Sequence, residues 1–441
     1  MFGAGYSIPG EGDEALRTCY FADLFRFASG VMQYLVFLRN HWRFVSFGVF
    51  LSMLSSFGQT FYVALYGADI RAEFGLSNGR FGAVFSVASI VAAGALVWLG
   101  KYIDRIDVRL YTLVSLMALF AGLAWLGFSS SIWMFGLAIF VVRFCGQGLC
   151  IHIASTSMAR YFPQDRGKAL SVSGLGLAGG EAFLPIIVVL VISVYGWRDA
   201  WLMTAGVFGV LALMLIPTFL KGHADRHRAY VARQSEARRD GQAGRSWTRL
   251  EVLGDRGYHA AMILLLAFPY IATGVFFHQA FIAEAKGWEL ERLAQGFMVL
   301  AVMKVLTSLL LGPLVDRLGA SRLVPATSLP MIGALAALIL SDSEFVPFIY
   351  LGLFGVGIGM LQPTLSAMLA ERYGVANLGG IRAMTTAAIV LSAAAAPATV
   401  GWMLDAGISI EWMSVWFLAY TVPAAGFAFV VLSRENQPLG A

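Results

Sequence analysis

The sequence predicts an all-α integral membrane protein with twelve transmembrane helices in two pseudo-symmetric six-helix bundles. Three observations predict this fold: the composition, twelve long apolar segments, and a motif that recurs at one constant spacing. Of the 441 residues, 59% are hydrophobic and only 13% are charged, whereas a soluble domain carries about 25% charged residues. The mean hydropathy is +0.74. This composition excludes ordinary soluble, disordered and fibrous proteins.

A bilayer core about 30 Å thick requires about 20 mostly apolar residues in each spanning helix. Twelve segments meet this requirement: 44–67, 79–100, 110–128, 132–158, 168–195, 200–220, 258–283, 293–315, 322–341, 346–370, 379–404 and 412–432. Short polar turns join most of them. One junction, residues 221–257, is long, polar and basic, so we expect a linker there between bundles over 44–220 and 258–432.

The two ends of the chain lie outside these bundles. Residues 1–43 mix acids with bases and show no cleavable signal peptide, and Tyr20–Arg43 is typical of an interfacial helix. Residues 433–441 are expected to form a short tail. Three cysteines without metal-ligand spacing predict neither a disulfide framework nor a metal site.

The distribution of Lys and Arg predicts the topology. With the N-terminus in the cytoplasm, 24 of the 31 basic residues fall on the cytoplasmic side and five on the opposite side. This asymmetry predicts an inner (plasma) membrane protein with both termini cytoplasmic. The net charge of +5 is then explained by topology, and we expect no nucleic-acid partner. The nine bases of the linker are typical of a solvated positive-inside loop, with contact to anionic lipid as the alternative.

The two halves repeat each other at a spacing of 212 residues. Asp104-Arg105 after the second segment corresponds to Asp316-Arg317 after the eighth. The pairs Arg160 and Arg372, Gly167 and Gly379, and Pro185 and Pro397 have the same spacing. One offset without gaps over about 85 residues indicates a duplicated six-helix unit. Transporters are built in this way, with the substrate site near the midplane between the repeats.

The repeated loop carries a family resemblance. It reads Gly100-Lys-Tyr-Ile-Asp104-Arg105 in the first half and Gly312-Pro-Leu-Val-Asp316-Arg317 in the second. With these two copies the chain resembles the major facilitator superfamily across all twelve segments. The resemblance implies a transporter in which this loop is a conformational lock made by Gly100, Asp104, Arg105, Gly312, Asp316 and Arg317. The alternative is a set of interfacial charges that only set the topology.

Ionisable residues inside a spanning segment are costly and are functional candidates by default. Arg143 and Glu181 lie near the middle of the fourth and fifth segments. We expect them to neutralise each other, either as a proton-coupling pair or as a static ion pair. Arg143 also resembles the arginine of proton-coupled antiporters of the family.

Lys304 lies about 11 residues into the eighth segment, too deep to reach either interface, and no acid occurs within that segment. A cation without a built-in partner predicts a site for an anionic substrate, and a bond to backbone or to Glu181 is the alternative. His278 is a candidate gate or substrate contact. His152 faces away from Arg143, as a packing donor or a proton relay.

Neutral polar side chains complete the candidate substrate site. Gln59 and Tyr62 lie on a polar stripe of the first segment, Gln147 follows Arg143 by one turn, and Gln362 lies on a polar face of the tenth segment. The resemblance places the first, fourth, seventh and tenth segments around the central cavity. Helix packing is the alternative role for such residues.

These observations predict a secondary active transporter, and not an enzyme, working by alternating access. With two bases and one acid at mid-depth, we expect a small organic anion such as a monocarboxylate, with proton coupling, no cofactor and a monomeric protein in the lipid bilayer. Gly196-Trp197-Arg198 and Glu73–Ser77 resemble the monocarboxylate and oxalate–formate group. The alternative is proton-driven efflux of hydrophobic or cationic compounds. An intramembrane enzyme is disfavoured because no nucleophile–base pair or metal cluster is evident.

Overall fold

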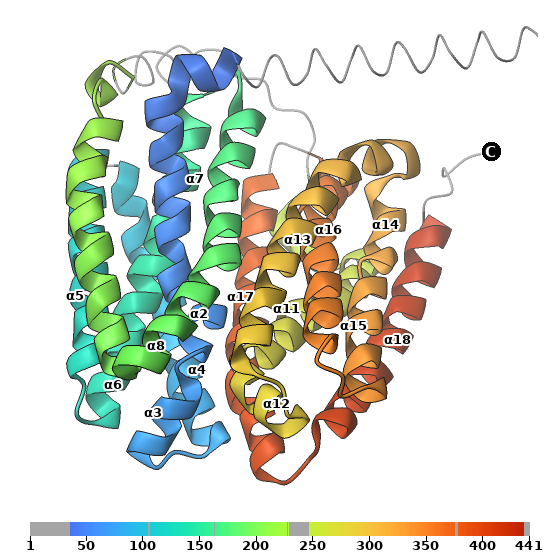
Figure 1. Ribbon diagram of the computed structural model, residues 1–441. Coiled ribbons are helices and arrows are strands. Elements are labelled where there is room, and N and C mark those ends of the chain that lie inside the picture. Colours follow the sequence, from blue (N-terminus) through green and yellow to red (C-terminus); the bar gives the residue numbers. More distant parts are fainter. Residues whose placement is uncertain are drawn as a thin grey trace, which may run out of the picture.

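The computed structural model describes residues 36–104, 106–162, 164–226, 228, 247–374 and 378–435, and every regular element in these residues is a helix (Figure 1). The expected interfacial helix over residues 20–43 lies outside this range except for residues 36–43, which open the first described helix. The last helix continues to Glu435, so most of the expected tail is also outside the described residues.

The first half begins with a helix over residues 36–54. The elements that follow are η1 (Ser55–Gly58), α2 (Thr60–Ala64), α3 (Gly67–Phe74), α4 (Asn78–Leu99), η2 (Gly100–Asp104), α5 (Val108–Phe128), α6 (Ile132–Val142), the π-helical η3 (Arg143–Cys150), α7 (Ile151–Tyr161) and α8 (Arg166–Phe219). The second half contains α10 (Arg249–Leu253), α11 (Arg256–Phe277), α12 (Gln279–Lys286), α13 (Leu290–Leu318), α14 (Ala320–Ala326), α15 (Leu329–Leu340), α16 (Val346–Tyr373), α17 (Leu378–Asp405) and α18 (Ile410–Glu435).

Ten helices in the described residues are long and apolar enough to cross a membrane. These ten helices account for eleven crossings, because α8 contains two spans. The first segment, which is broken and therefore not among the ten, supplies the twelfth. α8 is 54 residues long and turns at Gly196, whose φ of 80° suits glycine, so it covers the fifth and sixth segments. The first segment changes to a 3₁₀ turn at Ser55 and to extended backbone at Gln59. Large apolar side chains such as Trp133 (83% exposed) face outward, as a lipid-embedded bundle requires.

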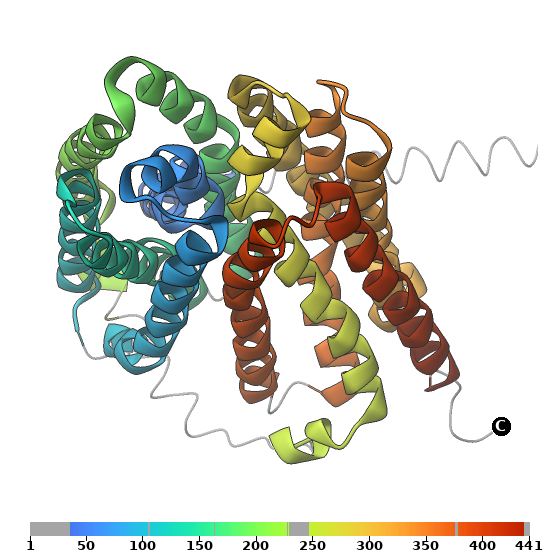
Figure 2. The same cartoon turned by 90° about the horizontal axis from the view of Figure 1, so that it is seen from below.

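The two halves lie side by side and meet through two pairs of long helices. α4 packs on α17, and the first part of α8 packs on α13; Figure 2 shows α4 beside α17. The repeat relates α4 (second span) to α13 (eighth span), and the first part of α8 (fifth span) to α17 (eleventh span). It therefore maps the α4–α17 contact onto the α13–α8 contact. The pseudo-symmetry predicted from the 212-residue spacing is therefore confirmed.

The molecule has two opposite ends along the direction of its long helices. We call one the termini face, because the first described helix begins there and α18 ends there (Figure 1). We call the other the α3–α12 face, since these two short helices lie on it (Figure 1).

Candidate functional site

An ion pair joins the two halves in the middle of the helix bundle. Lys304 Nζ on α13 lies 2.5 Å from Glu181 Oε2 on α8. Lys304 is fourteen residues from each end of α13, and Glu181 is fifteen residues from both the start of α8 and its turn at Gly196. At 1.5 Å per residue, each charge is about 21 Å from its helix ends. The side chains are 17% and 12% exposed, so each retains some accessible surface.

Glycines fix the position of both charges. A Cβ at Gly359 of α16 would lie 2.6 Å from the Lys304 carbonyl oxygen, and one at Gly180 would lie 2.0 Å from Ser56 Oγ. Only glycine permits these approaches, so α16 holds α13, and the first helix holds α8, at the residues that carry the pair. Ser308 Oγ also donates to the Gly359 carbonyl at 3.1 Å.

The Arg143–Glu181 pair expected from the sequence is wrong. Arg143 Nη1 donates to the Gly58 carbonyl at 2.9 Å and to Thr60 Oγ1 at 3.4 Å, and its guanidinium lies 4.6 Å from the Phe85 ring centroid. Gly58 ends the 3₁₀ turn of the first span, where exposed carbonyls and the helix dipole favour a cation. Glu181 pairs with Lys304 instead, so Lys304 has a partner, and the alternative named for it, a bond to Glu181, is the one found.

A backbone contact brings Arg143 to that carbonyl. A Cβ at Gly58 would lie 2.4 Å from the Gln147 nitrogen, and one at Gly146 would lie 2.9 Å from the Gly58 nitrogen. The π-helix of Arg143–Cys150 and the broken first span thus touch through backbone. π-Helical turns inside α-helices occur frequently at functional sites.

The predicted neutral contacts lie in different environments. Tyr62 is buried, and its hydroxyl lies 3.1 Å from Thr204 Oγ1 and 3.2 Å from the Tyr66 hydroxyl, inside the first half. Gln59 and Gln147 are half-buried and Gln362 is exposed. The last three side chains make no hydrogen bond to any described residue, so they keep amide groups available, whereas the Tyr62 hydroxyl is already engaged.

Contacts between α4 and α17 close the interface towards the α3–α12 face. Asp405, at the end of α17, accepts the backbone N–H groups of Asn78 (3.0 Å) and Gly79 (2.9 Å) at the start of α4. A carboxylate at a helix N-terminus satisfies free donors and complements the dipole. The Ala398 N–H donates to Ser86 Oγ at 3.2 Å, and a Cβ at Gly82 would lie 2.0 Å from the Pro397 oxygen. α4 and α17 are therefore in backbone contact here.

Two side chains of the seventh span complete this closure. His278 is buried and its Nε2 donates to the Pro397 carbonyl at 3.0 Å, within the second half. Gln279 Nε2 donates to the Phe61 carbonyl at 3.0 Å, which lies in the first half. Sequence reasoning assigned no role to Asp405 and no partner to Gln279. The sequence shows Asp405 and Gln279 only as polar residues at helix ends, and such a position does not reveal which residue of the other half each one contacts.

The repeated loop on the termini face is only partly described. Arg105 and the side chains of Asp104 and Asp316 lie outside the described part of the chain, and the surroundings of Gly312 are not described, so the conformational lock stays a prediction. Gly100 accepts a hydrogen bond from His152 Nε2 at 3.0 Å, which is the packing role expected for that histidine. Arg317 is exposed at the end of α13.

A second ion pair on the termini face lies within the second half. Arg372 Nε donates to Asp255 Oδ2 at 2.8 Å, and the Tyr373 hydroxyl donates to the same oxygen at 2.6 Å. Burial alone raises the pKa of the Asp255 carboxyl, but these hydrogen bonds and the Arg372 charge outweigh burial and lower the pKa to about 2.

The sequence profile of the Major Facilitator Superfamily matches residues 46–397, which is most of the chain. The chain belongs to the Major Facilitator Superfamily. Two curated relatives within it match part of their length. The oxalate:formate antiporter of Oxalobacter formigenes is 26% identical over 180 residues, 40% of this chain and 42% of that protein. A probable sulfoacetate transporter of Cupriavidus necator is 26% identical over 270 residues, 56% of this chain and 59% of that protein.

The chain therefore aligns with less than two thirds of the length of either relative. A solved structure supports the major facilitator fold over nearly the whole molecule. The solved structure is that of a bacterial homologue of the human lysosomal transporter Spinster, in an inward-facing and occupied conformation. It matches this chain with a TM-score of 0.64 and 14% identity. The match covers 88% of this chain and 96% of that one. As a member of this superfamily, with ten described helices long and apolar enough to cross a bilayer, the protein is a multi-pass membrane protein.

Proposed function

We propose that this transporter carries a small organic anion, by alternating access and with coupling to protons. The observation that carries the proposal is the Lys304–Glu181 ion pair, which bridges the two halves at mid-depth and keeps some accessible surface. The names of the two curated relatives, which concern oxalate, formate and sulfoacetate, support an anion. All three compounds carry carboxylate or sulfonate groups that a lysine can bind.

The proposed mechanism is a competition for Lys304. While Glu181 is ionised, its carboxylate holds the ammonium group and an incoming anion must displace it. When Glu181 takes up a proton, it loses its charge and becomes a weaker partner. Lys304 is then free to bind the substrate carboxylate. Binding of the proton and binding of the anion thus favour each other, which is the thermodynamic requirement for coupling.

Arg143 has a different role in this proposal. Its Nη1 group holds the broken first span through Gly58 and Thr60. Its Nε donor is buried and has no hydrogen-bond partner among the described residues. A buried donor without a partner is costly, so a substrate or water that accepts from this Nε is stabilised. We therefore retain Arg143 as a substrate contact and remove it from the proton-coupling pair.

The termini face is assigned to the cytoplasm in this proposal, because 24 of the 31 basic residues of the sequence belong to that side. The contacts of Asp405, Gln279 and Ser86 then close the outer side of the membrane, and the substrate leaves or enters from the inside. Labelling of single cysteines on intact cells measures this orientation. Labelling of an exposed linker position from outside would contradict it.

Uptake into proteoliposomes tests the proposed function. We expect uptake of at least one member of a panel of formate, oxalate and sulfoacetate, with stimulation by an inward proton gradient. Lys304→Gln is expected to reduce uptake at least tenfold, whereas Arg322→Gln, which removes an exposed charge of the second half, leaves it unchanged. Uptake of no anion, combined with extrusion of a cationic dye, would overturn the anion assignment in favour of cation efflux.

A further inference from the structure

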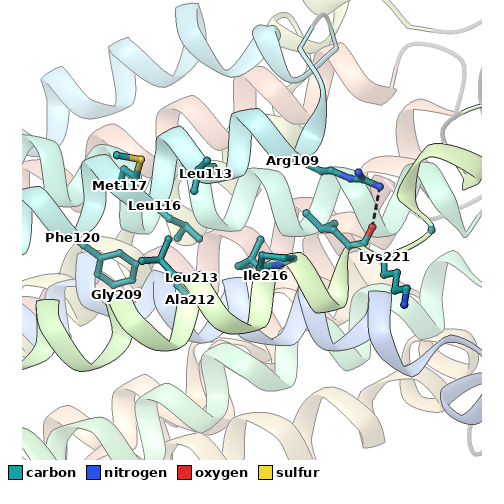
Figure 3. Close-up of a pocket in the computed structure, with 13 residues that line it drawn as sticks. Arg109, Leu113, Leu116, Met117, Phe120, Gly209, Ala212, Leu213, Ile216 and Lys221 are labelled. Atoms are coloured by element: carbon teal, nitrogen blue, oxygen red, sulfur yellow. Dashed lines mark hydrogen bonds between the residues drawn. The ribbon is translucent and has the colours of Figure 1, made fainter.

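A groove on the outer surface of the first half is separate from the Lys304–Glu181 site. It lies between α5 and the last part of α8 and has a volume of about 620 Å³. Figure 3 shows its lining side chains, which come from these two helices and the turn after α8. α5 forms the outer edge of the molecule, on the side away from the second half (Figure 1). The groove therefore opens towards the membrane and not towards the interface between the halves.

The groove has an apolar body and a basic end. Leu113, Met117 and Leu213 are 41%, 62% and 63% exposed, so the apolar body is accessible from outside. Arg109 and Lys221, both exposed, lie at the end near the termini face (Figure 3). The groove thus presents an exposed apolar surface along its length and two cations at its end near the termini face.

Local structure positions both cations. Arg109 Nη2 donates to the Leu220 carbonyl at 3.3 Å, the dashed line in Figure 3. This bond engages one guanidinium nitrogen and leaves the other donors of Arg109 available. Gly222 has a φ of 83° and turns the chain directly after Lys221. The Lys221 ammonium makes no ion pair with any described residue.

Asp107, two residues before Arg109, already has its interactions made, and Asp225 pairs with Arg228. Asp107 accepts the backbone N–H of Arg109 at 2.8 Å, where it caps α5. Its other oxygen lies 3.8 Å from His223 Nε2. Because Asp107 faces the helix end and the histidine, the two cations retain a net positive charge at the groove end.

We propose that this groove binds one anionic phospholipid. The phosphate group would contact Arg109 and Lys221, and an acyl chain would lie along Leu113, Met117 and Leu213. The charge complementarity at one end and the exposed apolar body at the other match the two parts of a phospholipid in the leaflet at the termini face. A soluble anion would use only the basic end, and an uncharged lipid would use only the apolar body.

Native mass spectrometry of the detergent-purified full chain tests the proposal. With dioleoylphosphatidylglycerol added, we expect one retained lipid, in clear excess over dioleoylphosphatidylcholine. The Arg109→Gln/Lys221→Gln double variant removes two surface cations and is expected to weaken retention about 30-fold. Its matched control is Arg256→Gln/Arg322→Gln, which removes two exposed cations at the same face of the second half and should retain the lipid as wild type does.

A second variant tests the apolar body without changing charge. Gly209 lines the groove, and a Cβ there would make only ordinary contacts with Phe120, at 3.6 Å or more. Gly209→Phe is expected to fill the groove and reduce retention. Gly206→Phe on the same helix points into open space and should not. Equal retention of both lipids by wild type, or equal retention by the charge variant and its control, would overturn the proposal.

Discussion

A charged side chain such as Lys304 or Glu181 raises the free energy of the folded protein when it lies at the middle of a membrane helix. Each of these two charges reduces the free-energy cost of the other. A charge that loses its partner at this depth is left uncompensated, whereas removal of both charges leaves neither to be solvated. The pair therefore makes the interface between the halves depend on the state of both residues. The same dependence allows a proton or an anion at this position to change how the halves are held together.

The dependence predicts non-additive effects on stability. Lys304→Met is expected to destabilise the protein by about 1–3 kcal/mol, because Glu181 is left without its partner. The Lys304→Met/Glu181→Met double variant should recover most of this loss. Thermal unfolding in detergent measures both changes. A double variant that is destabilised by the sum of the single effects would contradict the ion pair.

Arg143 stabilises a break in a helix. Arg143→Gln is expected to lower stability by about 1.5–3 kcal/mol, since a charged donor to the Gly58 carbonyl is lost. Arg143→Lys should not fully restore it, because an ammonium lacks the planar guanidinium that lies over the Phe85 ring. Thermal unfolding again supplies the measurement, and full stability of the lysine variant would show that only the charge matters.

Asp255 predicts a pH dependence on the termini face. Its pKa of about 2 in the folded protein lies below its ordinary value of 3.8. A depressed pKa contributes stability above pH 4, and this contribution is lost as the pH falls towards 2. Asp255→Asn is therefore expected to cost up to about 2 kcal/mol at pH 6. The difference from wild type should vanish near pH 2; a constant difference across this range would contradict the assignment.

At the scale of elements, apolar length predicted the spans but not their interruptions. The first segment was predicted as one continuous span, yet Gln59 is extended and the fourth segment contains a π-helix. Both deviations arise where Gly58 and Gly146 let two backbones touch. That contact is between residues far apart in the sequence, so local pattern does not contain it. For the same reason Glu181 was assigned to the wrong cation.

Glycine contacts also hold α4 against α17. Gly82→Ala places a methyl group 2.0 Å from the Pro397 oxygen, so the helices must separate. Gly94→Ala on the same helix meets nothing within 4 Å and is the matched control. Spin labels at the exposed positions Ala68 and Ala285, on either side of the closure, report the separation by pulsed electron resonance. We expect longer distances for Gly82→Ala alone; unchanged distances in a folded variant would contradict the role of this contact.

At the scale of the whole molecule, the duplicated unit and the twelve spans were predictable because composition and spacing repeat along the chain. The described hydrogen bonds between the halves lie at the midplane and towards the α3–α12 face, made by Lys304, Gln279, Asp405 and Ser86. The conformation is therefore closed on that face. In the proposed function, substrate binding at the midplane and opening of this face involve the same pair of halves, which is the arrangement that alternating access requires.

In the proposed mechanism, an anion and the Glu181 carboxylate compete for Lys304. The affinity of the purified protein for the transported anion, measured as a function of pH in wild type and in Glu181→Gln, tests this competition. We expect affinity that falls with rising pH in wild type, and tight, pH-independent binding in Glu181→Gln. Lys304→Gln should not bind the anion at either the lowest or the highest pH measured. An identical pH dependence in wild type and Glu181→Gln, or normal binding by Lys304→Gln, would contradict the claim.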